Sequence, residues 1–143
     1  MFHSGESYNG QFYMGNKHGQ GTYTYINGDI YNGNWVNNMR HGKGELLFFK
    51  TQQKYIGEFI NNIRQGKGTE IFPGGEKFEG NFEGNLRKGS GVLKFPNGSI
   101  LNSEFKDNMA NGKGKMNYAN GNEYDGEFKN GMRNGKGLLI RIL

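Results

Sequence analysis

The sequence predicts an all-β protein, an elongated single-layer twisted antiparallel sheet of about six consecutive β-hairpins. Three observations predict it. A short phrase of alternating aromatic residues and glycine returns six times, a pair of glycines follows each copy, and Asn-Gly or Gly-Gly dipeptides separate most copies. The copies start 23, 24, 23, 23 and 23 residues apart. Self-similarity of this period indicates a repeat array, in which each unit packs only against its neighbours.

Five of the six copies open with an aromatic residue, then glycine, then a second aromatic residue at every other position, and the fifth has Leu101 and Ser103 at the first two of these positions. The copies begin at Tyr8, Tyr31, Tyr55, Phe78, Leu101 and Tyr124. Successive side chains of a strand point to opposite faces, so Tyr8, Gly10 and Phe12 would share one face. After a turn, Gly21 and Tyr23 alternate with polar residues in the same way. Each copy is therefore predicted to form a hairpin.

The segments between copies predict that the sheet continues from one hairpin to the next. Asn and Gly tolerate positive φ and favour tight turns between antiparallel strands. Such dipeptides stand at Asn27-Gly28, Gly74-Gly75, Asn97-Gly98 and Asn120-Gly121. The second copy is one residue longer and has Lys50-Thr51-Gln52-Gln53-Lys54 in place of the glycine turn, which predicts a bulge or a longer loop.

Glycine is a poor strand residue, so its fixed place needs a physical reason. Gly10 and Gly21 fall on the ring-bearing face, where a missing side chain lets a neighbouring ring lie across the backbone. We expect the same of Gly19 and Gly33. The rings would then form a continuous apolar floor on one face of the sheet.

The composition supports one thin domain over residues 1–143. The chain has 26 Gly but only 2 Pro, and 14% of its residues are aromatic, which is more than a flexible linker carries. Its hydrophobic fraction of 33% would not fill a thick two-layer core. There is no cysteine, so a disulfide framework is excluded. Apolar runs are too short for a signal peptide or a membrane span, and we expect a cytoplasmic protein.

The pattern Tyr-x-Gly-x-Phe/Trp followed by Gly-x-Gly every 23 residues resembles the MORN repeat, the membrane occupation and recognition nexus. The resemblance covers Tyr8 to about Leu139 and implies a single-layer twisted antiparallel sheet. Repeat five departs from it, with Leu101 and Ser103 in place of Tyr and Gly and with Ala110 where the other repeats have a base. Glu70 places a carboxylate on the ring face, where other repeats have Tyr, Leu or Met.

The chain shows no pattern typical of an enzyme, and we predict no catalytic residue, metal site or cofactor. His18 and His41 occupy one repeat position and are best explained as repeated turn residues. The stretch Gly84 to Ser90 has the glycine spacing of a phosphate loop but lacks the Lys-Ser/Thr that such a loop needs. The recurring carboxylates, among them Glu58, are explained by a solvated face and by cross-strand pairs.

The ring-bearing face is the predicted binding surface for a partner protein, with an amphipathic helix as the natural occupant. The alternative is that the rings cover one another and form only a thin core. The residues assigned to this face are Tyr8, Phe12, Tyr23, Tyr25, Tyr31, Trp35, Tyr55, Phe59, Phe78, Phe82, Phe105, Tyr124 and Phe128.

Basic residues recur at two repeat positions and suggest a second hypothesis, a peripheral membrane module. The chain carries 18 Lys and Arg against 13 Asp and Glu, a formal net charge of +5. Stacked hairpins would align these bases along one long edge, where they could attract anionic lipid headgroups. The alternative is that they pair with neighbouring carboxylates. No reader fold for nucleic acid accompanies them. The two rows are Lys17, Arg40, Arg64, Arg87 and Arg133, and Lys43, Lys67, Lys113 and Lys136.

The end of the chain, Leu138-Leu139-Ile140-Arg141-Ile142-Leu143, is apolar and leaves the last strand uncapped. Open edges favour a homo-oligomer through the sheet edges, a docked helix or burial in a larger assembly. The family resemblance implies cytoskeletal scaffolds, axonemal radial spokes, membrane junctions and accessory modules of lipid kinases. Of these we favour a ciliary or cytoskeletal scaffold without catalytic activity.

Overall fold

The computed structural model describes residues 5–140 as one open antiparallel sheet of twelve strands, whose order in space is their order in the chain. The predicted all-β array of six hairpins is therefore confirmed. Shorter odd-numbered strands alternate with longer even-numbered ones. The strands are β1 (Ser7–Tyr13), β2 (Asn16–Thr24), β3 (Ile30–Val36), β4 (Met39–Leu47), β5 (Lys54–Ile60), β6 (Ile63–Ile71), β7 (Lys77–Glu83), β8 (Leu86–Lys94), β9 (Ile100–Lys106), β10 (Met109–Asn117), β11 (Glu123–Lys129) and β12 (Met132–Ile140).

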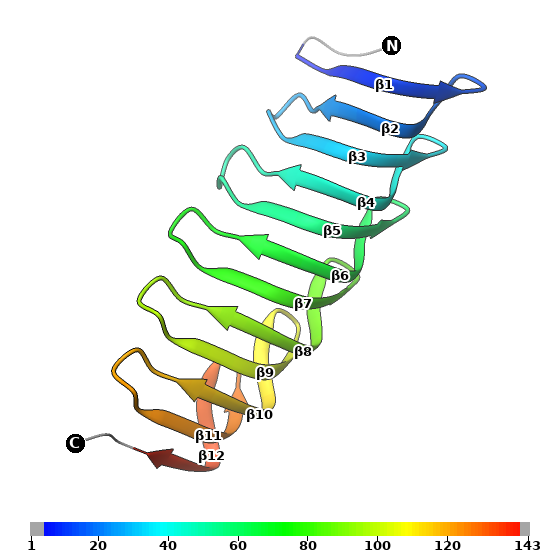
Figure 1. Ribbon diagram of the computed structural model, residues 1–143. Coiled ribbons are helices and arrows are strands. Elements are labelled where there is room, and N and C mark those ends of the chain that lie inside the picture. Colours follow the sequence, from blue (N-terminus) through cyan, green and yellow to red (C-terminus); the bar gives the residue numbers. More distant parts are fainter. Residues whose placement is uncertain (1–4, 141–143) are drawn as a thin grey trace.

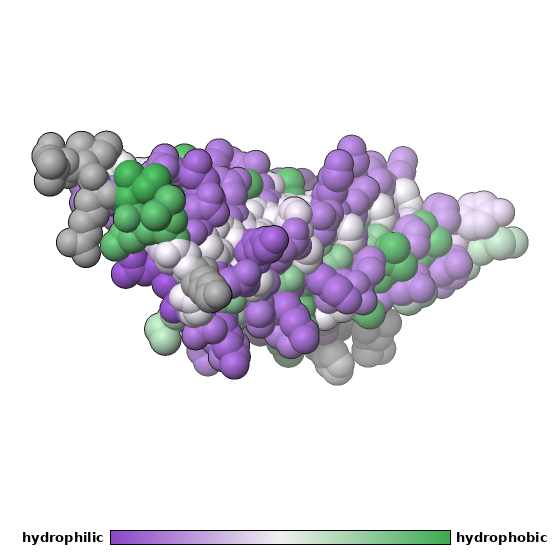
Figure 2. All heavy atoms as spheres, turned by 90° about the horizontal axis from the view of Figure 1, so that it is seen from below, coloured by the Kyte–Doolittle hydropathy of each residue, from purple (hydrophilic) through white to green (hydrophobic). Residues whose placement is uncertain are grey.

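The sheet is elongated, with β1 and β12 as its two open edges (Figure 1). The hairpin ends of the later repeats turn away from the rest of their strands, so the sheet is folded along its length rather than flat. Seen from below, the surface is largely hydrophilic, with an apolar cluster towards one end (Figure 2). The last strand contributes exposed apolar residues, since Leu138 and Ile140 are 62% and 44% exposed. Residues 141–143 of the predicted apolar end lie outside the described residues.

Six two-residue turns close the hairpins, and both central residues of each have positive φ. Asn37 and Asn38, for example, have φ of 47° and 67°. Positive φ at both positions defines the type I′ turn, whose twist matches that of the flanking strands. Asparagine, aspartate and glycine tolerate this conformation, which explains why they fill nearly all of these positions.

The connections between hairpins are longer, and four of the five turn at a single glycine. Gly28 has φ of 94°, and its N–H donates to the Tyr25 carbonyl at 2.9 Å. In the second repeat the connection runs over residues 48–53, one residue more than residues 25–29 of the first. There Gln52 takes the positive φ, at 61°, and its N–H donates to the Phe48 carbonyl. The predicted longer loop is confirmed.

A bulge bends every hairpin at the first glycine of the Gly-x-Gly pair. Between the pairs Gly10–Gly21 and Phe12–Lys17, β1 advances two residues and β2 four, so β2 carries two extra residues. The conformation of Gly19 (φ 82°) forms this bulge, and a side chain there would meet Gln11, not a ring. The prediction that Gly19 makes room for a ring was therefore wrong.

The other glycines of the prediction, Gly10, Gly21 and Gly33, do make room for rings. A Cβ on Gly33 would lie 2.7 Å from the Tyr31 hydroxyl oxygen and still closer to the Gly44 backbone, and a Cβ on Gly44 would overlap the Tyr31 ring. The ring crosses this glycine pair, and its hydroxyl donates to the Asn34 carbonyl at 2.8 Å. Tyr55 repeats the arrangement on Gly57 and Gly68. These glycine pairs thus leave the space in which a ring packs against the backbone.

Repeat five shows the same rule in reverse. Leu101 replaces the ring, and Ser103 replaces the glycine beneath it. The Ser103 side chain fills the space opposite Gly114, and its hydroxyl donates to the Glu104 carbonyl at 3.0 Å. In this repeat the ring and the glycine beneath it are therefore both replaced, by Leu101 and Ser103.

Rings from successive hairpins form the core of this single layer. Tyr31 contacts Trp35 and Phe59, and Tyr55 contacts Phe59 and Phe82, each pair with centroids 5.1 Å apart and planes near perpendicular. Edge-to-face pairs of this kind add about 0.5–1.5 kcal/mol each beyond their burial. Because each ring is covered by the rings of the next hairpin, the array needs no second layer.

Candidate functional site

The predicted partner-binding rings are mostly buried. Ten of the thirteen rings are buried, and Tyr31, Tyr55 and Phe78 are 0% exposed. Only Phe12, at 57%, is well exposed, while Tyr8 and Tyr25 are half-buried. The sheet therefore does not present an open apolar floor. The rings cover one another and form a thin core, which is the alternative given in the sequence analysis. Direct contact between the buried rings and a partner stays an untested prediction.

The first basic row lies over these rings, and all of its members except Arg133 are partly buried. Arg40 faces the cross-strand partner Trp35, and its guanidinium carbon lies 5.3 Å from the Phe59 centroid. Arg87 lies 4.5 Å from the Phe78 centroid. A guanidinium over a ring face is attracted by the ring quadrupole. Lys17, Arg64 and Arg133 occupy the same place in their repeats.

The two basic rows do not share one edge, which corrects the sequence prediction. Lys43, Lys67 and Lys113 are exposed and alternate with the glycines that seat rings, so they lie on the opposite face. The side chain of Lys136 lies outside what the structure describes. Counting residues would have revealed this, because Arg40 precedes Leu46 by an even number of positions and Lys43 by an odd number.

A second row of rings, which the sequence analysis missed except for Tyr25, follows the even-numbered strands β2 to β10. These residues are half-buried and stand at the start of the loops between hairpins. Four of these rings are stacked by the arginine of the next hairpin, at 5.5–5.9 Å from the ring centroids. The pairs are Arg40 over Tyr25, Arg64 over Phe48, Arg87 over Phe72 and Arg133 over Tyr118. Their aromatic character two residues after the ring-face position was the available signal. The row is Tyr25, Phe48, Phe72, Phe95 and Tyr118.

We call the surface between the loop rings and the buried rings the trough. It is lined by the loop rings Tyr25, Phe48, Phe72, Phe95 and Tyr118 and by the bases Lys17, Arg40, Arg64, Arg87 and Arg133. The side chains of Arg40, Arg64 and Arg87 are held in place by the turn of the next hairpin. The Arg40 N–H donates to Asn62 Oδ1 at 2.9 Å, the Asn62 N–H donates to the Arg40 carbonyl, and Arg40 Nη2 donates to the Asn62 carbonyl at 2.8 Å.

Glu70 lies on the ring face, as predicted, and joins two arginines. Its carboxylate contacts Arg87 Nε at 2.7 Å and Arg64 Nη1 at 3.4 Å. The three side chains are only 13–19% exposed. Burial lowers the pKa of Arg64, and the nearby Glu70 carboxylate acts in the opposite direction. Enclosed charges of this kind are stable only when paired, so the triad is a fixed part of the trough.

One hairpin earlier, the trough contains a hollow of about 410 Å³ between Arg40 and Arg64. Leu46 and Phe48 form part of its wall, and Asn62 and Asn85 come from the turns. No carboxylate within residues 5–140 forms an ion pair with Arg40, and its Nε is buried without a hydrogen-bond partner. This hollow is apolar on one side and cationic on the other.

The six-hairpin architecture agrees with a family comparison. The model of the MORN repeat matches residues 8–30, 31–50, 55–77, 78–100, 103–123 and 124–141, nearly the whole chain. This chain is a MORN-repeat protein. No curated protein matches the sequence.

Two solved structures share the MORN array's fold at low sequence identity. The TCP domain of SAS-4 (dCPAP) from Drosophila melanogaster has a TM-score of 0.54 and 22% identity over 85% of this chain. The TCP10 domain of CPAP from Danio rerio has a TM-score of 0.51 and 12% identity over 75% of this chain. The MORN array spans 65% and 48% of those chains, less than two thirds of each.

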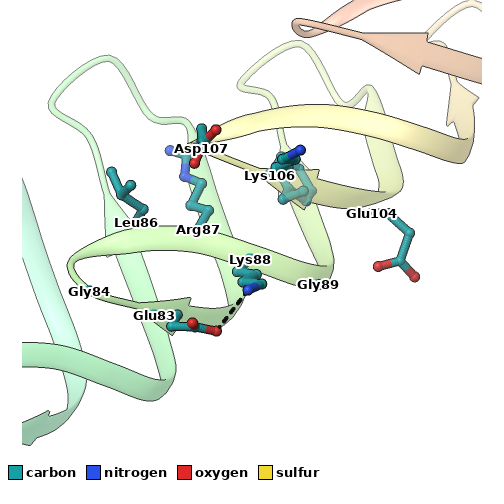
Figure 3. A pocket seen from close by; sticks show the side chains of 10 residues that line it. Glu83, Gly84, Leu86, Arg87, Lys88, Gly89, Glu104, Lys106 and Asp107 are labelled. Carbon is teal, nitrogen blue, oxygen red and sulfur yellow. Dashed lines mark ion pairs between the residues drawn. The ribbon is translucent and has the colours of Figure 1, made fainter.

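A second hollow of the MORN array, of about 550 Å³, lies where hairpin four meets hairpin five (Figure 3). In repeats two and three the side chain before the bulge accepts a hydrogen bond from the next turn: His41 Nδ1 accepts from the Asn61 N–H at 3.4 Å, and Gln65 Oε1 accepts from the Gly84 N–H at 2.9 Å. Lys88 cannot accept and instead pairs with Glu83 at 3.1 Å. The Asn108 N–H reaches the Arg87 carbonyl only at 3.5 Å, against 2.9–3.1 Å at the preceding two junctions.

The remaining predicted positions of the MORN array have structural roles. Gly84 and Asn85 form a type I′ turn with φ of 58° and 70°, so the stretch to Ser90 is a hairpin and opens no helix. His41 Nδ1 accepts from the Asn61 N–H at 3.4 Å, in keeping with a turn-supporting residue. His3 lies outside the described residues. Residues 5–140 contain no cluster of three metal-ligating side chains and no helix able to cross a membrane.

Proposed function

We propose that this protein is a non-catalytic scaffold that binds a segment of a partner protein along the trough, within a cytoskeletal or ciliary assembly. One observation carries the proposal. The loop rings are half-buried, periodic and separated by positioned guanidinium groups, while the buried rings beneath them hold the backbone rigid. Rigid aromatic and arginine side chains are the residues most enriched at binding hot spots.

The fold comparison gives this proposal a precedent. The Drosophila TCP domain was solved in complex with a proline-rich motif of Ana2, and the Danio rerio TCP10 domain with a peptide of STIL. Both are single chains of related fold that hold a short segment of another protein.

A site-specific crosslinking experiment tests the proposal. The photoreactive residue p-benzoylphenylalanine replaces Phe48 in the trough or Ile56 on the opposite face, which is 42% exposed. Each chain is irradiated in an extract of the source cells, and crosslinked peptides are identified by mass spectrometry. We expect one partner segment from the Phe48 position and no specific product from Ile56. Equal capture from both positions, or capture from Ile56 alone, would place the binding surface elsewhere.

The structure also determines which alanine variants can test the partner surface. Trp35 and Phe59 are 2% and 1% exposed, so replacing either with alanine would cost about 3–5 kcal/mol of folding stability. Phe48→Ala and Phe72→Ala remove half-buried loop rings instead and are expected to reduce capture severalfold while the circular dichroism spectrum stays unchanged. Undiminished capture by both variants would contradict a role for the loop rings.

The membrane hypothesis receives less support from the arrangement of the bases. Lipid headgroups require basic side chains that extend into solvent. The side chains of Arg64 and Arg87 are 19% and 13% exposed, stack on rings and share Glu70. Cosedimentation with phosphatidylserine vesicles tests this hypothesis, and salt-sensitive binding that is lost in Arg40→Ala would restore it.

A further inference from the structure

We propose that the hollow between Arg40 and Arg64 binds a carboxylate side chain, a Glu or Asp of the partner segment, which bridges the two guanidinium groups. The inference rests on the proposed function, because it specifies which partner side chain enters the trough. It assigns to the second and third hairpins a site for an acidic residue.

The chain itself contains the template for such a site. Glu70 stands opposite Tyr55 and Phe78 and bridges Arg64 of its own hairpin and Arg87 of the next. One hairpin earlier, Leu46 stands at the equivalent place, opposite Tyr31 and Tyr55. The equivalent arginines are Arg40 and Arg64. A carboxylate between successive arginines is therefore already accommodated by this backbone.

The hollow lies where the template carboxylate is missing. Arg40, Leu46 and Arg64 all line it. The guanidinium of Arg40 is fixed by the Asn62 carbonyl and by the rings of Tyr31 and Phe59, so it is oriented before any ligand arrives. Orientation in advance lowers the entropy cost of binding, and a planar guanidinium favours the planar, two-oxygen carboxylate group.

The charges around the hollow favour a single anionic group. Asp29 also lines it, but its Oδ1 accepts from the Phe49 N–H at 2.9 Å and its Oδ2 from Asn27 Nδ2 at 3.1 Å. Asp29 is therefore held by its own loop and the next one and forms no ion pair with Arg40. Arg64 shares Glu70 at the longer of that residue's two contacts, 3.4 Å. Of the two arginines that line the hollow, Arg40 is thus the one whose guanidinium has no carboxylate partner among the described residues.

Nuclear magnetic resonance of the full chain tests the inference with a small carboxylate probe in place of the partner segment. The probe is glutamate capped as N-acetyl and N-methylamide, which carries one carboxylate, and the matched control is the capped glutamine. We expect saturable shifts of the Arg40 and Arg64 Nε–Hε signals with the glutamate probe and none with the glutamine control. The absence of saturable shifts would overturn the inference.

Three variants identify the site. Arg40→Gln is expected to weaken probe binding about tenfold or more, because it removes a charge-assisted hydrogen bond. Leu46→Glu supplies an internal carboxylate as Glu70 does and is expected to abolish the titration, while the neutral Leu46→Gln retains it. If the Leu46 variants do not fold, Arg40→Gln decides alone, and unchanged affinity in that variant overturns the inference.

Further arms separate this inference from the proposed function. Inorganic phosphate that binds more tightly than the glutamate probe, with the same shifts, would overturn the assignment to a protein carboxylate. Crosslinking from Phe48 with no response to the glutamate probe would overturn the inference and leave the proposed function standing. A response to the probe without any crosslinked partner would support the carboxylate site and overturn the proposed function.

Discussion

The pairing of Tyr31 with Gly33 makes a quantitative prediction, because repeat five shows what happens when both residues change. In Gly33→Ser the new Cβ would meet the Tyr31 hydroxyl oxygen and the Lys43 carbonyl, both at 2.7 Å. Overpacking of this kind costs about 1–3 kcal/mol. Displacing the ring also breaks its hydrogen bond to the Asn34 carbonyl, which is worth about 1 kcal/mol. The expected loss of stability is therefore about 2–4 kcal/mol.

The partner change is Tyr31→Leu, which reproduces Leu101 of repeat five. It removes a fully buried ring and is expected to cost about 2–3 kcal/mol. In the double variant the serine enters the space that the ring has left, as Ser103 does opposite Gly114. The double variant should therefore lose less than the sum of the single variants, by roughly 1–2 kcal/mol.

Urea unfolding of the four chains measures this coupling. Repeat arrays depart from two-state unfolding when neighbouring units separate. Far-ultraviolet circular dichroism and Trp35 fluorescence should accordingly be recorded together, and free energies compared only where the two transitions coincide. Tyr31→Phe, the natural residue at Phe78, is the control and should lose only the hydrogen bond. Costs that simply add, to within about 0.5 kcal/mol, would refute the account of the strand glycines.

Two further predictions concern charge and ionisation. Glu70→Gln leaves Arg64 and Arg87 without their shared carboxylate and should lower the free energy of unfolding in urea by about 2–4 kcal/mol. Glu45→Gln removes an exposed ion pair and should lower it by less than about 1 kcal/mol. Equal losses in the two variants would contradict the enclosed triad. Burial raises the pKa of Tyr55 to about 12, so the folded state keeps its proton after the unfolded chain loses it near 10. The stability that the protonated Tyr55 gives the folded state is fully present below pH 10 and is lost between pH 10 and 12. A difference titration at 295 nm against Tyr55→Phe checks this. Ionisation of Tyr55 near pH 10 would contradict it.

The strand order and the seating of rings on glycine could be predicted from the sequence because both follow from period-two alternation. Tyr31, Gly33 and Gly44 keep their parity in every copy, and the alternation alone places them on one face. The bulge at Gly19 could not be found in this way. Its two extra residues preserve the parity of β2, so the sequence pattern is the same with or without the bulge.

The contacts that the bases and the loop rings make required three-dimensional information, although residue parity alone separates the two basic rows. Arg40 looked like a turn residue because it follows Asn38 closely in the sequence, yet its side chain turns back over Phe59. Phe48 looked like part of an apolar run. The packing of one hairpin against the next brings it against Arg64, as it brings Tyr25 against Arg40. Both features depend on contacts between hairpins, which a single repeat does not encode.

The junction between hairpins four and five bears on how the array carries mechanical load. There the Arg87 guanidinium reaches the Asn108 carbonyl only at 3.4 Å, and Lys88 supplies no acceptor to the next turn. Hairpin five also lacks a stacked base, because Ala110 stands where the other hairpins have Lys or Arg. Tension applied along the array would concentrate at this seam. The protein would then part first into a stiff segment of four hairpins and a shorter one of two, and the trough would be interrupted at a defined point.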